Sequence, residues 1–186
     1  MPTPTSTSTP TPTPVITISD IDPFGAACNF VIDRLEGGEK QVVDRGGLTK
    51  WGISKKANPD IDIANLSREG AVSLYRSRYW DNYNIGALPP ALALLVFDAG
   101  VNMFPPVAIR MLQNVLGVKG DGVLGAKTAA SARSYRPQSE LRALFSEIRL
   151  RHYEDLARNY PVHRPNLYGW RLRCFRVADE AGRWGG

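Results

Sequence analysis

The chain has 186 residues, of which 43% are hydrophobic, and a formal net charge of +5. This length and composition predict one globular domain that buries a sizeable core. The only cysteines, Cys28 and Cys174, form no CxxC pair and no disulfide framework, so we expect buried apolar residues made in a reducing compartment. Two histidines without an HExxH motif argue against a catalytic zinc site.

The positive charge is concentrated in one part of the chain. Up to Ala132 there are 12 Lys or Arg and 12 Asp or Glu, whereas the remainder has 11 Arg, no Lys and 6 acids. An excess of arginine favours nucleic acid, acidic lipid surfaces or cell-wall polyanions as partners, with a solvated basic helix face as an equal alternative. Because no recognition-helix or RNA-binding signature occurs, we expect no nucleic acid partner.

The N-terminal segment, residues 1–20, differs in composition from the rest. Pro2 to Pro14 alternates proline with serine or threonine and has no charge, which predicts a disordered or extended tail. It has neither the charged start nor the apolar core of a signal peptide. The longest apolar run, Leu88 to Val101, contains Asp98 and is too short to span a bilayer.

Apolar residues at three- and four-residue spacing predict a mainly α fold. Asp22 and Pro23 suit the start of the first helix, and Ser67 that of the second. Glycine-broken, β-branched sequence between these helices predicts a small β element. The expected helices cover residues 22–36, 67–80, 91–101, 105–115, 127–135, 138–159 and 167–181.

One acidic residue precedes the predicted β element and a second lies within it. Glu36 ends the apolar stripe of the first helix, just before Gly37 and Gly38, and Asp44 precedes Gly46-Gly47. Glycoside hydrolysis needs one carboxylic acid to protonate the leaving oxygen and a second group that activates water or attacks. Glu36, against an apolar face, is the candidate acid, and Asp44 is the candidate that stays ionised. Taken alone, two acids at this spacing are more often plain surface charges.

The segment Glu36-Gly37-Gly38, followed by Asp-x-Gly-Gly-x-Thr-x-x-Gly-Ile-Ser at residues 44–54, resembles the N-acetylmuramidases of glycoside hydrolase family 108, which are phage endolysins and related lysozymes. The resemblance covers about residues 24–176. Further motifs in the same order are Tyr75-Arg76-x-x-Tyr79-Trp80, Phe97-Asp98-x-x-Val101-Asn102, Leu112-Gln113-x-x-Leu116-Gly117 with Asp121-Gly122-x-x-Gly125-x-x-Thr128, and Gly169-Trp170-x-x-Arg173.

This resemblance implies a lysozyme-like helical bundle with Glu36 as the catalytic acid. Asp44 and Thr49 would hold the attacking water, although Thr49 also suits a plain strand. The residues expected to contact substrate are Gly37, Gly38, Gly47, Trp51 and Asn102. Asn102 alternatively caps a turn, and Asp98 is expected to be a buried structural acid.

The resemblance also divides the folded chain. Residues 21–104 would form the catalytic region, and residues 105–186 resemble a peptidoglycan-binding module packed with it as one globule. Residues 112–128 come close to a phosphate-loop pattern, but one residue too many precedes Lys127, and Asp121-Gly122 is better interpreted as a turn between helices. Whether this segment binds glycan or only packs stays open.

Together these features predict a monomeric endolysin without a cofactor that cleaves the β-1,4 bond between N-acetylmuramic acid and N-acetylglucosamine. The expected partners are the glycan strand and anionic envelope polymers near the arginine-rich third. Without a signal segment, the enzyme would wait in the cytoplasm until a holin-like pore opens the membrane. The alternatives are a lytic transglycosylase, which uses one glutamate and no water-holding aspartate, and a catalytically inactive wall-binding module.

Overall fold

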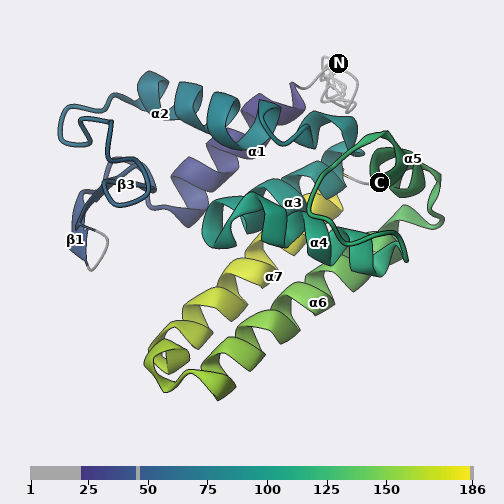
Figure 1. The fold of residues 1–186 in the computed structure, drawn as a ribbon. Coiled ribbons are helices and arrows are strands. Elements are labelled where there is room, and N and C mark those ends of the chain that lie inside the picture. The colour runs from purple at the N-terminus through teal and green to yellow at the C-terminus, as the bar shows by residue number, and fades with distance from the viewer. Residues whose placement is uncertain (1–21, 45–46, 185–186) are drawn as a thin grey trace, which may run out of the picture.

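The computed structural model describes residues 22–44 and 47–184 (Figure 1). The predicted tail, residues 1–20, lies outside the described residues. The helices are α1 (Pro23–Phe30), α2 (Arg68–Tyr75), α3 (Pro90–Met103), α4 (Pro105–Val115), α5 (Ala126–Ser134), α6 (Gln138–Asn159) and α7 (Leu167–Trp184). Shorter turns are the π-helical η2 (Val31–Leu35) and η3 (Arg76–Asp81) and the 3-10 helices η4 (Ile85–Ala87) and η5 (Pro161–Asn166).

The β element is a three-stranded antiparallel sheet in the order β1-β2-β3. Its strands are β1 (Val42–Asp44), β2 (Gly47–Lys50) and β3 (Ile53–Ser54). Thr49 pairs with Val42 on one side and with Ser54 on the other. The predicted fold, a mainly α lysozyme-like bundle with a small β element after the first helix, is confirmed.

Side chains at the predicted caps start the first two helices. The Asp22 carboxylate accepts hydrogen bonds from the backbone N–H groups of Phe24 and Gly25, and Pro23 occupies the first helical position. The Ser67 hydroxyl accepts from the backbone N–H of Gly70. These bonds satisfy donors that have no partner within the helix, so both predicted starts are confirmed.

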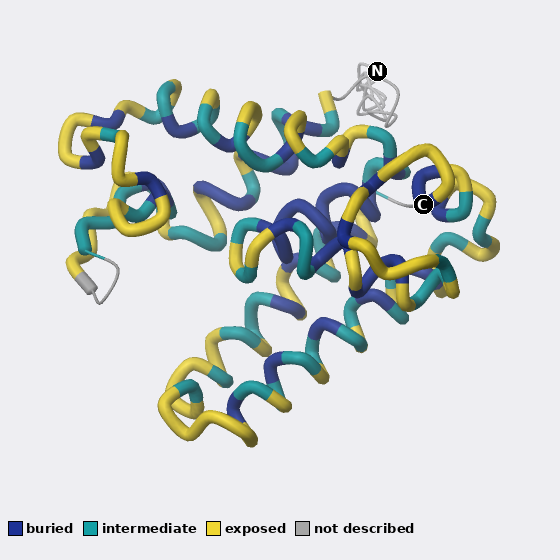
Figure 2. Tube along the Cα trace, viewed as in Figure 1, coloured by how far each residue is buried: buried dark blue, intermediate teal, exposed yellow. Residues whose placement is uncertain are grey.

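Helix α3 is the centre of the core. Residues 91–100 are all buried, and α3 packs against α1, α4, α6 and α7 (Figure 2). Leu92, Leu94 and Leu95 are at most 1% exposed, and burying each contributes about 2 kcal/mol of transfer free energy. The prediction that this apolar helix is central is confirmed.

The loop between α4 and α5 is held by one buried amide. Gln113 donates to the Asp121 carboxylate at 2.7 Å and accepts from the backbone N–H of Gly122 at 2.8 Å. Gln113 also contacts the Thr128 hydroxyl. Asp121-Gly122 is therefore a turn between helices, as predicted, and this motif is explained by packing of the loop.

The sheet and the α6–α7 hairpin extend outward from the body around α3. Figure 1 shows the sheet on one side of the body and the α6–α7 hairpin projecting below it. Because α7 runs back along α3 to the body, its middle lies against the core helix. Arg173 of α7 contacts Glu36, the residue directly after η2.

Both cysteines are buried and free, Cys28 in α1 and Cys174 in α7. They are 0% and 5% exposed, so the expectation of buried apolar residues is confirmed. Burial raises the pKa of the Cys28 thiol to about 12, against the smaller lowering effect of Arg68. At neutral pH this thiol stays protonated and is a poor nucleophile.

We predict that the native protein reacts slowly with a disulfide reagent such as DTNB at pH 8, because neither thiol is accessible and Cys28 does not ionise. Absorbance of the released thiolate measures the reaction. In guanidinium chloride the same sample should release two equivalents at once. Rapid release of two equivalents from the native protein would contradict this packing.

Candidate functional site

Glu36 lies where the first helix ends. Its backbone N–H donates to the carbonyl of Val31, five residues earlier, which is the π-helical pattern of η2. The next two residues, Gly37 and Gly38, have φ of 79° and 68°, a conformation that favours glycine and stops the helix. π-helical turns are frequent at functional sites, and here one places the carboxylate at the helix end.

The Glu36 carboxylate forms an ion pair with α7. Its Oε1 lies 2.7 Å from a guanidinium nitrogen of Arg173, and the two side chains are 19% and 11% exposed. The site is partly open on the glutamate side, while the arginine is largely enclosed. A substrate could therefore reach Glu36 without displacing Arg173.

Arg173 is held from behind by a second carboxylate. Asp98 of α3 is 0% exposed and accepts from Arg173 Nε at 2.9 Å on Oδ1. Its Oδ2 accepts from Arg149 of α6 at 2.6 Å, and Arg149 is only 1% exposed. Two arginines and two carboxylates thus form one ion-pair chain, Glu36–Arg173–Asp98–Arg149, that links four elements.

Burial and neighbouring opposite charges together set the pKa values of the groups in the ion-pair chain. Burial by itself raises the pKa of Asp98, but the guanidinium groups of Arg173 and Arg149 hold that pKa below its usual range. The carboxylates in turn raise the pKa of Arg173 and of Arg149 despite their burial. All three groups stay charged, and the expectation that Asp98 is a buried acid is confirmed.

The chain continues from Arg149 toward the surface. Both Nε and one terminal nitrogen of Arg149 donate to the Tyr153 hydroxyl, at 3.4 and 3.3 Å. That hydroxyl donates to Asn102 in the last turn of α3. The ring of Tyr153 stacks on Trp170 at 4.7 Å between centroids. Asn102 therefore has a partner within the protein, whichever role it has toward substrate.

The turn between β2 and β3 meets Glu36 from the opposite side. Trp51 and Gly52 both have positive φ, 55° and 77°, as a two-residue type I′ hairpin turn requires. Trp51 is only 8% exposed, and its indole N–H donates to the carbonyl of Leu66. Holding a tryptophan in this region costs about 1–2 kcal/mol, which its burial and this bond offset.

Gly52 is the point of closest approach. A Cβ at this position would lie 2.5 Å from Glu36 Cγ and 2.5 Å from the Tyr75 hydroxyl. The same hydroxyl donates to the carbonyl of Trp51 at 3.0 Å. Burial and then the negative charge of Glu36 raise the pKa of Tyr75, so the hydroxyl keeps its proton. Gly52 lets the sheet contact Glu36 directly.

The other predicted site residues lie in or beside the sheet. Asp44 ends β1 and pairs with Gly47 of β2, but its side chain lies outside the described residues. Thr49 is half-buried in β2, and Gly47 has φ of 81°. The structure brings Glu36 and Gly52 together, and the ring of Trp51 packs in the core rather than lying open. The roles of Asp44, Thr49 and Trp51 toward substrate stay predictions.

The sequence analysis assigns no role to Arg173 or Arg149, and for Asp98 it predicts burial without naming a partner. A signal was present: Arg149 falls four residues after Phe145 and four before Tyr153, on the buried stripe of α6. A charged residue on an apolar stripe indicates a buried partner, and Asp98 inside the apolar run of α3 is that partner.

Two family models match adjacent parts of the chain. Residues 29–103 match Glycosyl hydrolase 108, and residues 107–174 match the Predicted Peptidoglycan domain. The predicted resemblance to glycoside hydrolase family 108 is confirmed. The two matches support a glycoside hydrolase that acts on peptidoglycan. Arg173, the ion-pair partner of Glu36, belongs to the second matched region and not to the family 108 region itself.

A solved structure has the same overall arrangement. Brucella abortus SagA superposes with a TM-score of 0.74 at 26% sequence identity, covering 87% of this chain and 95% of that one. None of the curated proteins compared with the chain matches it. In the described part of the chain, no helix is both long enough and apolar enough to cross a bilayer. Residues 22–44 and 47–184 also include no cluster of three potential metal ligands.

We predict that Asp98→Asn lowers the free energy of unfolding by about 3–5 kcal/mol, because two buried guanidinium groups lose their shared carboxylate. Urea denaturation followed by circular dichroism measures the change. Asp155→Asn is the control, since Asp155 is exposed and forms only a surface pair with Arg158. If Asp98→Asn lowered the free energy of unfolding by less than 1 kcal/mol, the ion-pair chain would not be what holds the helices together.

We predict that Gly52→Ala loses both activity on peptidoglycan and more than about 1 kcal/mol of stability, because the methyl group displaces Glu36 and φ is positive. Gly117→Ala is the matched control. Gly117 has φ of 64°, but nothing lies within 4 Å of the added Cβ. It therefore bears the backbone strain without the contact. Equal activity in the two variants would contradict the close approach to Glu36.

Proposed function

We propose that this protein is an N-acetylmuramidase, in which Glu36 acts as general acid on the β-1,4 bond between N-acetylmuramic acid and N-acetylglucosamine. The observation that carries the proposal is the Glu36 carboxylate itself. It lies in the family 108 region, partly exposed, and is fixed by Arg173 at 2.7 Å. A fixed, partly exposed carboxyl group is what protonation of a leaving oxygen requires.

The two oxygens of Glu36 have different tasks in this proposal. Arg173 contacts Oε1, so Oε2 is the oxygen that we assign to the glycosidic oxygen. The guanidinium of Arg173 forms ion pairs with both Glu36 and Asp98. The arginine therefore orients the acid while a second carboxylate shares its charge.

The second catalytic group comes from the sheet. We assign the attacking water to Asp44 and Thr49, which lie on β1 and β2. These strands are hydrogen-bonded neighbours, and the β2–β3 turn places the sheet against Glu36 through Gly52. Movement of the sheet would thus change the spacing between acid and water. The residues that we propose to contact the glycan near the acid and the water are Gly37, Gly38, Gly47, Trp51 and Asn102.

Two other functions fit parts of the same site. A lytic transglycosylase needs only the glutamate and leaves anhydro-muramic ends, whereas hydrolysis leaves reducing muramic ends. A wall-binding module without activity would leave the glycan intact. Mass spectrometry of the products from purified peptidoglycan separates the three functions. Reducing muramic ends are the result that we expect, and anhydro ends or undigested glycan would contradict the proposal.

We predict that Glu36→Gln lowers the rate of peptidoglycan cleavage by about 100- to 10,000-fold, the usual contribution of a general acid. The amide keeps the size of the side chain and can still accept a hydrogen bond from Arg173, but it cannot donate a proton. Reducing-end release measures the rate, and a thermal melt checks that the fold is intact.

Glu39→Gln is the control for this substitution. Glu39 is exposed, three residues away, and its carboxylate is 3.9 Å from Lys50. Removing its charge should leave the rate within about twofold, since exposed pairs contribute little. If Glu36→Gln were as active as Glu39→Gln, Glu36 would not be the acid.

A further inference from the structure

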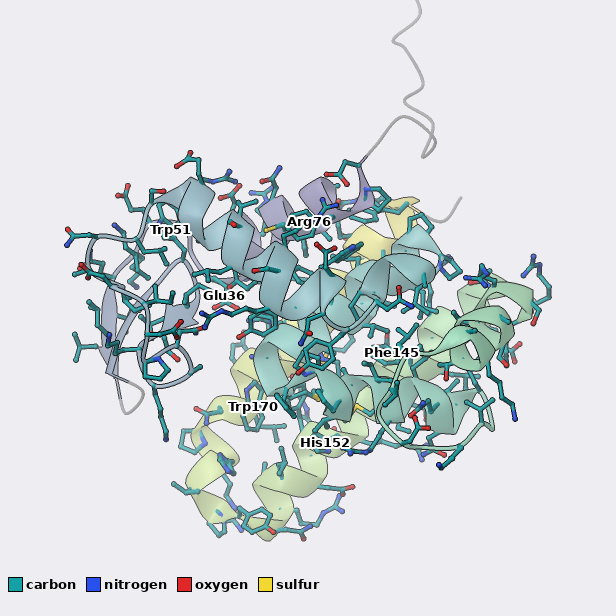
Figure 3. The ribbon with its side chains drawn as sticks, turned by 45° about the horizontal axis from the view of Figure 1, so that its top comes forward. Glu36, Trp51, Arg76, Phe145, His152 and Trp170 are labelled. Carbon is teal, nitrogen blue, oxygen red and sulfur yellow. The ribbon has the colours of Figure 1, made fainter. Side chains whose placement is uncertain are left out.

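A groove that takes no part in the Glu36 site runs between α4 and α6. It consists of two adjoining cavities of about 530 and 250 Å³ that share Asn114, Ile148 and Arg151. The two helices pack side by side (Figure 1), so both walls are regular helical surface. Figure 3 shows His152, one of the lining residues, on the α6 part of the body, away from the Glu36 label.

The groove has an apolar floor. Its apolar lining residues are Val107, Met111, Val115, Leu144 and Ile148. Met111 is 8% exposed, and the others are half-buried. The floor is built from aliphatic side chains, and His152 supplies the ring among the lining residues. Small methyl groups fit such a floor better than the broad face of a sugar, which pairs with flat aromatic rings.

The charges along the rim leave one guanidinium without a counterion. Glu147 pairs with Arg151, and Asp155 pairs with Arg158, which lies outside the lining. For Arg110, no ion pair occurs among the described residues, and its guanidinium rests within 3.3 Å of where a Cβ of Gly122 would be. The Arg151–Glu147 pair is an exposed pair between successive helical turns, so it is weak and can be exchanged for another carboxylate.

We propose that this groove binds the stem peptide of peptidoglycan, with peptide carboxylates on Arg110 and Arg151 and alanine methyl groups on the floor. The inference rests on peptidoglycan as the substrate. Every lining residue falls within residues 107–174, the part matched by the Predicted Peptidoglycan domain. The stem peptide combines small side chains with free carboxylates, and arginine pairs with carboxylates in a bidentate geometry.

Binding measurements on two forms of the substrate test the groove. The full-length protein bearing Glu36→Gln is titrated against intact peptidoglycan and against glycan strands stripped of peptides by an amidase. Adding Arg110→Glu and Arg151→Glu should weaken binding to intact peptidoglycan by about tenfold and leave binding to stripped strands unchanged. Equal weakening on both forms, or no weakening, would overturn the proposal.

A charge-matched variant separates specific pairing from general attraction. Lys127→Glu with Arg176→Glu makes the same charge change on exposed residues of α5 and α7 outside the groove. Its binding to both substrates should stay within about twofold of the parent, and an equal loss on intact peptidoglycan would overturn the proposal. Thermal melts of all variants should coincide, because the substituted side chains are exposed.

A third arm keeps this inference separate from the proposed hydrolysis. Cleavage of stripped strands by the wild type reports on Glu36 chemistry alone. If the strands are not cleaved but the groove variant still loses binding to intact peptidoglycan, the proposed function fails and the groove stands. If cleavage occurs and the groove variant binds both forms as the parent does, the groove proposal fails alone.

Discussion

The structure depends on one buried carboxylate, Asp98, held between Arg149 and Arg173. Removing these charges from water costs several kcal/mol per group, and only close pairing in the interior offsets that cost. Each of the three charged groups comes from a different helix, so α3, α6 and α7 can satisfy them only in one arrangement. Arg173 also forms an ion pair with Glu36. Glu36 is thus oriented by the interaction that also fixes the helices.

The opposite side of Glu36 is defined by backbone rather than charge. Gly52, in a turn that forces Trp51 to positive φ, brings the sheet into contact with the glutamate, and the Tyr75 hydroxyl holds the turn. The acid is therefore positioned by α7 on one side and by the sheet on the other. Since Arg173 comes from the region matched by the Predicted Peptidoglycan domain, that region completes the Glu36 site as well as offering its own groove.

The sequence predicts the elements better than it predicts the site. Helix starts are marked by local chemistry at Asp22, at Ser67 and at the proline pairs where α3 and α4 begin. These starts agree with the structure. The position of Glu36 at a helix end follows from the adjacent glycines. By contrast, the partners of Glu36 lie far along the chain, and arginines usually belong to solvated faces. Only the coincidence of Arg149 with an apolar stripe and of Asp98 with an apolar run indicates that they are buried together.

The most direct test of this account is a crystal structure of the Glu36→Gln protein in complex with a peptidoglycan oligosaccharide. The account places the scissile glycosidic oxygen within about 3 Å of the side chain at position 36, the distance that proton transfer needs. That side chain should also remain bonded to Arg173. An oligosaccharide bound with its glycosidic oxygens beyond the reach of position 36, or a side chain turned away from Arg173, would contradict the central claim that this ion-pair chain presents the catalytic acid.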